Sequence, residues 1–217
     1  MMLTMTSFQL LCLLLPLAAA ALPDYSETYA QYMVDFSGAA YCAGTLGHGV
    51  DNWSCGACKA HPAVTNSTVI SESSATKTLN GFVAYDSEED RIVLSISGTD
   101  PLKIKDWIDD LDFFKTDYPL CDKYGSNKCQ VHEGFLASYD VGKDAIVTAI
   151  KAYRAGFPTA TLHVTGHSLG AIMAVFAALD LTLEHGIVVD SILTFGQPRG
   201  GDADFSNFFE QHLEEYR

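Results

Sequence analysis

Apolar residues along the chain recur at two spacings, that of an α-helix and that of a β-strand. Helical spacing predicts helices over residues 25–41, 101–111, 134–155, 169–183 and 205–212. Runs of β-forming residues predict strands over residues 80–85, 92–96, 113–120, 161–165 and 187–195. Because strands and helices alternate from residue 134 onward, the pattern indicates an α/β fold with a largely parallel central sheet and helices on both faces.

The beginning of the chain differs from the rest in having no charge. Residues 1–23 hold no charged side chain and include an apolar run that ends in small residues. This pattern is typical of a secretory signal peptide cleaved near Ala20 or Ala21, and the run is too short to span a bilayer. We therefore expect a signal peptide over 1–21, one mature domain over 22–217, and a secreted protein without a transmembrane anchor. A buried N-terminal helix is the alternative, because the first seven residues lack Lys and Arg.

The charge balance narrows the range of partners. The 217 residues include 13 Lys and Arg against 27 Asp and Glu, which gives a formal net charge of −14. A chain this acidic, with no basic cluster, is a poor match for a nucleic-acid backbone, so we expect no nucleic-acid partner. Hydrophobic residues make up 48% of the chain and charged residues 18%, a balance typical of a folded domain.

Five cysteines remain once a signal peptide is removed. They are Cys42, Cys55, Cys58, Cys121 and Cys129. In an oxidising compartment we expect disulfides, and the odd number leaves one thiol without a partner in this chain. A zinc site needs four ligands, and the chain has no second Cys-x-x-Cys pair, so we expect no metal. The loop predicted over 42–66 also carries two glycosylation sequons, at Asn52 and Asn66.

One short motif carries candidate chemistry. Residues 166–170 read Gly-His-Ser-Leu-Gly, with a β-forming segment directly before them and a helix of small and apolar residues directly after. A nucleophile elbow needs this arrangement, because its serine lies in a strained turn and the glycines let strand and helix approach closely. The alternative is an ordinary strand–turn–helix that contains a serine. The flanking segments favour Ser168 as a nucleophile.

Six short motifs, this one included, follow one another along residues 28–217. They are AYC at 40–42, SGT at 97–99, DWIDDL at 106–111, VHEGF at 131–135, GHSLG at 166–170 and TFGQPR at 194–199. In this order they resemble the fungal-type class 3 lipases of the α/β-hydrolase fold. The resemblance implies a secreted serine carboxylic ester hydrolase, foremost a triacylglycerol lipase, which works through an acyl-enzyme at an oil–water interface and needs no cofactor.

The resemblance also implies roles for single residues. Ser168 would be the nucleophile, and Thr99 and the backbone N–H of Leu169 would form the oxyanion hole. Alternatively, Thr99 is only a turn residue at the end of a strand. His132 would be a structural residue beside the site rather than a base. The sequence departs from the family pattern at Ser97, where the family usually has Arg, and at Ala171, where a glycine is common.

Residues 101–111 would form a lid over the site. Their apolar stripe consists of Ile104, Trp107, Ile108 and Leu111 together with Leu102. In water such a helix hides its apolar face, and at a lipid surface it can swing and offer that face to the interface. Asp110 would hold the Thr99 hydroxyl. A fixed surface helix with a permanently buried stripe has the same periodicity and stays open as the alternative.

A serine nucleophile needs a base and an acid, and the residues after Ser168 offer no suitable pair. In α/β-hydrolases they follow the serine in the order Asp or Glu, then His. His185 lies at the far end of the helix after Ser168, about 25 Å away at 1.5 Å per residue, and His212 lies on the last short helix. The resemblance places the acid and the histidine after a strand that would begin near 216. We therefore expect a lipase domain truncated at its C-terminus, with the triad Asp and His outside this chain.

The cysteines fit the same expectation. With Cys55 paired to Cys58 and Cys121 paired to Cys129, Cys42 is left over, and the resemblance implies that its partner lies near the C-terminal end of the complete domain. A second hypothesis is a catalytically inactive short form that binds lipid or a partner, although its exposed sheet edges argue against it. A disulfide-stapled binding module is a third, and it leaves the six motifs unexplained. Phospholipids and feruloyl esters stay open as substrates.

Overall fold

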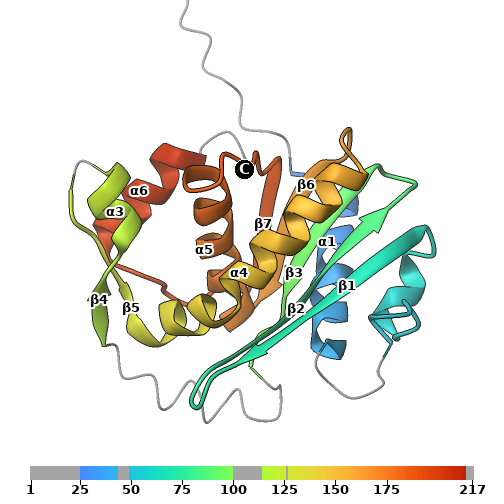
Figure 1. Ribbon diagram of the computed structural model, residues 1–217, viewed down its shortest axis with the longest axis horizontal. Coiled ribbons are helices and arrows are strands. Elements are labelled where there is room, and N and C mark those ends of the chain that lie inside the picture. Colours follow the sequence, from blue (N-terminus) through green and yellow to red (C-terminus); the bar gives the residue numbers. More distant parts are fainter. Residues whose placement is uncertain (1–24, 44–48, 100–113, 126, 214–217) are drawn as a thin grey trace, which may run out of the picture.

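The computed structural model describes residues 25–43, 49–99, 114–125 and 127–213. The expected signal peptide and the lid with Asp110 lie outside these residues. A five-stranded sheet with the strand order β1-β2-β3-β6-β7 forms the centre of the described part (Figure 1). Its strands are β1 Val64–Ser73, β2 Thr78–Asp86, β3 Arg91–Ile96, β6 Thr161–His167 and β7 Ser191–Phe195.

Most of this sheet runs in one direction. β2 pairs antiparallel with both β1 and β3, whereas β3 pairs parallel with β6 and β6 pairs parallel with β7. Only β2 therefore opposes the other four strands, and the expected largely parallel sheet is confirmed for the described residues. A separate antiparallel pair consists of β4 Lys115–Asp117 and β5 Gln130–His132.

Helices cover both faces of the sheet, as the sequence predicts (Figure 1). α1 Glu27–Ala39 lies on one face, whereas α4 Glu133–Gly156 and α5 Leu169–Leu183 lie on the other. The shorter helices are α3 Pro119–Tyr124, α6 Ala203–Leu213 and the 3₁₀ turns η1 Ala40–Cys42 and η2 Ala57–Ala60. This layering is that of an α/β protein with the sheet in the middle.

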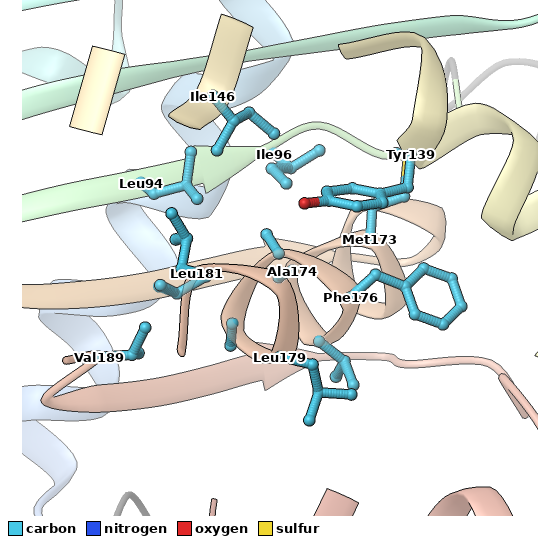
Figure 2. Close-up of a cluster of buried hydrophobic side chains, with 14 of the residues drawn as sticks. Leu94, Ile96, Tyr139, Ile146, Met173, Ala174, Phe176, Leu179, Leu181 and Val189 are labelled. Atoms are coloured by element: carbon cyan, nitrogen blue, oxygen red, sulfur yellow. The ribbon is translucent and has the colours of Figure 1, made fainter. Parts of the chain in front are cut away.

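Helix α5 is buried almost all round because it packs against the sheet and is flanked by α4, α3 and α6. Figure 2 shows Leu94 and Ile96 of β3 and Ile146 of α4 gathered near Ala174 and Leu181 of α5, and all five side chains are fully buried. Burying an aliphatic side chain of Leu or Ile size contributes about 1.5–3 kcal/mol. This packing fixes the direction in which α5 leaves the sheet, and it thereby fixes the turn between β6 and α5.

The structure corrects the sequence-based prediction of three strands. The pattern missed β1 because an edge strand with mostly exposed side chains carries little apolar alternation, and Asn66 consequently lies in a strand rather than in a loop. The strand predicted over 113–120 is reduced to Lys115–Asp117, because Pro119 begins α3 at a position that favours proline. The strand predicted over 187–195 begins only at Ser191, and residues 187–190 form a loop before it.

The cysteine pairing is confirmed for the described residues. Cys55 is bonded to Cys58 and Cys121 to Cys129, while Cys42 is a half-buried free thiol at the end of η1. The pairing of Cys42 with a more C-terminal cysteine stays a prediction. Both sequon asparagines, Asn52 and Asn66, are exposed, so their side chains are accessible for the expected glycosylation.

A buried histidine joins α1 to the sheet. His163 of β6 shares hydrogen bonds with the Tyr29 hydroxyl (2.6 Å) and the Thr161 hydroxyl (2.9 Å), and Tyr29 also donates to Ser191 (2.7 Å). Burial, with the nearby Arg91 charge, lowers the pKa of His163 from 6.5 to about 4. The neutral ring is therefore part of the interface between α1 and the sheet.

We expect this histidine to make stability depend on pH. An unfolded histidine takes up a proton near pH 6.5, whereas folded His163 does so only near pH 4. The unfolded state binds more protons between these values, so stability falls as pH falls from 6.5 to 4, by about 3 kcal/mol at 1.36 kcal/mol per pKa unit. His163→Gln should remove this part of the slope in urea titrations at several pH values. The exposed His185→Gln serves as the control, and equal slopes in both variants would contradict the assignment.

Candidate active site

Ser168 occupies the strained turn that the motif predicts. Its φ and ψ are 56° and −126°, in a region that residues with a Cβ rarely adopt. Its backbone N–H donates to the Phe195 carbonyl (3.0 Å), and its own carbonyl accepts from Ala171 N–H (3.0 Å). The serine is thus held between the end of β7 and the first turn of α5. Such strain persists only where the surroundings impose it, and it is concentrated at functional sites.

The two motif glycines are required because the backbone of a neighbouring segment lies too close to each of them for a side chain to fit. A Cβ on Gly170 would overlap the Ile96 carbonyl at the end of β3, and a Cβ on Gly166 would overlap the Gly170 carbonyl. Helix α5 therefore begins directly against the ends of β3 and β6. Ala171, where the family commonly has glycine, is fully buried in the same turn.

The loop after β3 passes beside the serine. A Cβ placed on Gly98 would lie 3.0 Å from the Ser168 Cβ and 2.6 Å from the His167 carbonyl. Ser97 anchors this loop to β2, since its N–H and its hydroxyl both donate to the Asn80 carbonyl (2.9 and 3.1 Å). Ser97 therefore braces the loop at the position where the family usually has an arginine.

Thr99 and Leu169, the two expected oxyanion-hole residues, line one cavity of about 330 Å³. The other lining residues, several of them hydroxyl- or amide-bearing, are Thr76, Lys77, Thr78, Asn80, Ser97, Gly98, Ser138 and Met173. The structure thus brings the end of β3 and the first residue of α5 to one concave surface beside Ser168. Preset backbone donors at such a place stabilise the oxyanion of acyl transfer, each by a few kcal/mol.

Tyr41 links the elbow to this loop, and sequence reasoning assigned it no role. Its hydroxyl shares a 2.7 Å hydrogen bond with Nδ1 of His167 and lies 2.5 Å from the point where a Cβ on Gly98 would be. Burial raises the pKa of the Tyr41 hydroxyl, and a hydrogen bond with the Gly98 backbone partly offsets that rise. Its place in the AYC motif was the only signal in the sequence.

The described histidines have structural partners. His132 is the N-cap of α4, where its Nδ1 accepts from Gly134 N–H (3.1 Å) and its ring stacks on Phe135. Burial and the Lys77 charge lower the pKa of His132, so the ring is neutral near pH 7. His185 lies 3.7 Å from Asp180 at the far end of α5. Within the described residues, no hydrogen bond joins a histidine to the Ser168 hydroxyl.

Asp202, which follows Ser168 in the chain, also has a structural role. One carboxylate oxygen accepts from Phe205 N–H (2.9 Å) at the start of α6, and the other accepts from Gln130 N–H (3.1 Å) in β5. The described residues include no group of three or more His, Cys, Asp or Glu side chains arranged to hold a metal ion. They also include no helix that is both long and apolar enough to cross a membrane.

Comparisons with known proteins agree with this geometry. The sequence profile of the family described as "Lipase (class 3)" matches residues 93–217. A secreted mono- and diacylglycerol lipase 1 from Fusarium solani is 35% identical over 144 residues, which cover 65% of this chain and 40% of that protein. A lipase from Rhizomucor miehei is 35% identical over 133 residues, which cover 59% of this chain and 34% of that protein.

Solved structures give the same answer for the fold. The native lipase–propeptide complex of Rhizomucor miehei superposes with a TM-score of 0.72 at 29% identity, over 85% of this chain and 57% of that chain. The mostly parallel sheet, its covering helices and the serine elbow define an α/β-hydrolase. The chain belongs to the class 3 lipase family, whose members are carboxylic ester hydrolases. It spans less than half the length of the two curated relatives.

Proposed function

We propose that the protein is a secreted serine carboxylic ester hydrolase whose foremost substrate is a triacylglycerol. The Ser168 hydroxyl gives its proton to a base while Oγ attacks the ester carbonyl, and the oxyanion is held by the Thr99 and Leu169 donors. The alcohol then leaves with a proton, and water hydrolyses the acyl-enzyme to release the fatty acid. The base and its orienting acid are required in addition, and neither lies at Ser168 within the described residues.

The observation that carries this proposal is the conformation of Ser168. A serine at a φ of 56° between β6 and a buried helix, with the Gly98 backbone against its Cβ, has no evident role in packing. Leu169, the residue that follows Ser168, lines a cavity together with Thr99. The two disulfides support secretion, because such bonds persist in oxidising compartments.

The lid is part of the same proposal. Residues 101–111, which lie outside the described residues, begin two positions after Thr99, and their apolar stripe is the basis for proposing a lid over the site. We expect hydrolysis of tributyrin to rise steeply once its concentration passes the solubility limit and an oil–water interface forms. Initial rates measured by alkali titration across that limit test this expectation, and a rate that stays proportional to dissolved substrate would remove the lid from the proposal.

A second candidate function is binding without turnover. The observation in its favour is that, within the described residues, no hydrogen bond joins a histidine to Ser168, while His132, His167 and His185 contact other groups. A purified, folded protein that binds tributyrin emulsions but releases no butyrate would support this candidate and contradict the hydrolase.

A further inference from the structure

Strand β1, at the edge of the central sheet, carries one of the two glycosylation sequons. Residues 66–68 read Asn-Ser-Thr, and the structure places them inside β1 and not in a loop. Within the described residues, β1 pairs with β2 on one side and with no strand on the other (Figure 1). The outer edge of such a strand presents backbone N–H and C=O groups that can template pairing with another chain.

β1 lacks the features that usually protect an edge strand. It runs over ten residues, contains no proline or lysine, and has Glu72 as its one charged residue. Its bulge lies at the beginning, between Val64 and Asn66, and the pairing with β2 is regular from there to Ser73. Short strands, prolines, lysines and bulges that turn the edge away are the common protections against edge-to-edge association. Residues 66–73 therefore need protection from another source.

The surface beside this edge is partly apolar. A cavity of about 480 Å³ lies between β1 and α4. Its lining includes Val69 and Ile70 of β1 and three alanines of α4, Ala145, Ala149 and Ala152. A strand added at the edge would place alternate side chains in this cavity, and burial of their apolar surface would favour association.

A second copy of β1 meets no like charge at this edge. Antiparallel pairing of two β1 strands about Val69 would put Val69 opposite its own copy and Glu72 opposite Asn66. The one charge of each strand would thus face a neutral side chain, whereas like charges directly opposite each other are destabilising. Two-fold symmetric pairing of identical surfaces is also the commonest form of dimer.

We propose that Asn66 carries an N-linked glycan, and that this glycan prevents β1 from pairing with β1 of a second copy. Asn66 is exposed and, by the two-residue period of a strand, faces the same side as Thr68, whose hydroxyl shares a 3.1 Å hydrogen bond with Tyr153 of α4. Its cross-strand neighbour Tyr85 stacks on Phe157, directly after α4. These side chains occupy the inner part of that side, so a bulky, hydrated glycan extends outward over the place of a second strand.

The modification needs only a donor of the secretory pathway, an oligosaccharide linked to a lipid diphosphate. A bond forms between Asn66 Nδ2 and C1 of the sugar, the C1–O bond to the diphosphate breaks, and the lipid diphosphate leaves as one amide proton is released. Thr68 supplies the hydroxyl that the sequon requires. The inference therefore rests on the proposed secretion and not on the ester chemistry of Ser168.

The first measurement asks whether Asn66 is modified. The protein secreted by a eukaryotic host is digested with trypsin, which yields a peptide over residues 60–77 with this sequon as its only one. Peptide N-glycosidase in heavy-oxygen water converts each glycosylated Asn to a labelled Asp, which mass spectrometry detects. We expect the label at Asn66 in most molecules. A secreted protein with no label at Asn66 overturns the inference, whereas a protein retained inside the cell overturns the proposed secretion.

The second measurement asks what the glycan prevents. Asn66→Gln and Thr68→Val each remove the sequon, whereas the control Thr68→Ser keeps it and the control Asn52→Gln removes the other sequon, before η2. In sedimentation velocity, we expect the parent protein and both controls to stay single chains as the protein concentration rises. Asn66→Gln and Thr68→Val should approach twice the mass of one chain.

A further variant tests whether the association occurs through β1. Val69→Lys in the Asn66→Gln background would place two lysines opposite each other in the proposed pair, so the dimer should be lost. Circular dichroism and thermal unfolding establish that each variant is folded. A folded Asn66→Gln protein that stays a single chain, or a dimer that survives Val69→Lys, would overturn the inference.

Discussion

We expect substitution of Ser168 by Ala to lower kcat for the proposed ester hydrolysis by at least about 10⁴-fold, since removal of a catalytic serine leaves only the oxyanion hole and binding to act. The change deletes the attacking oxygen and leaves the Cβ in place against Gly98. No described side chain shares a hydrogen bond with this hydroxyl, so no stabilising contact is lost within that part of the fold. Rates on tributyrin and on a soluble p-nitrophenyl ester measure the effect.

A matched serine outside the site serves as the control. Ser206 is exposed on α6, and its replacement by Ala should leave kcat unchanged. Thermal unfolding should show that both variants are as stable as the parent protein to within about 1 kcal/mol, as for changes that touch no buried contact. A folded Ser168→Ala protein that keeps a tenth of the parent rate would exclude Ser168 as the nucleophile.

Gly170→Ala is the substitution with the largest expected effect on stability. The added methyl group would overlap the backbone carbonyl of Ile96, which is fixed in the sheet and cannot turn away as a side chain can. Helix α5 would have to move away from β3, and its buried contacts with the sheet would loosen. We expect a loss of at least about 3 kcal/mol in the free energy of unfolding, in the range known for overpacked cores. Urea titration followed by circular dichroism measures it.

Gly156→Ala provides the matched control for this change. Gly156 is the last residue of α4, and a Cβ there meets no atom within 4 Å. Alanine also has the higher helix propensity, so this variant should be as stable as the parent protein or slightly more stable. Similar destabilisation by both substitutions would show that the close approach at Gly170 is not the reason for the glycine.

The sequence was most informative where burial is strongest. Helix α5 and strand β3 were predicted because most of their side chains are apolar, and β6 was predicted because a β-forming segment directly precedes the serine motif. The elbow was predicted because a short motif stood between a strand and a helix that both proved correct. The strained φ of Ser168 follows from that arrangement and is not encoded by the serine itself.

The missed features depend on contacts between distant segments. Strand β1 is an exposed edge, so its residues carry a weak apolar pattern and its pairing with β2 is what makes it a strand. Tyr41 lies in η1, directly after α1, and contacts His167 of the elbow. Lys77 lies in the turn between β1 and β2 and lines the cavity with Thr99 and Leu169. Neither residue type is diagnostic by itself, because tyrosines pack in cores and lysines are usually solvated. Only the fold brings them beside Ser168.

The central claim is that Ser168 forms the covalent intermediate, and active-site labelling tests it most directly. The protein is incubated with a p-nitrophenyl ester of an alkylphosphonate, which phosphonylates an activated serine and releases p-nitrophenol. Digestion with trypsin then yields a peptide over residues 155–199, and tandem mass spectrometry locates the added mass within it. We expect one phosphonate per molecule, on Ser168, with hydrolysis lost in proportion. A phosphonate on another residue, or full hydrolysis by a protein whose Ser168 stays unlabelled, would contradict it.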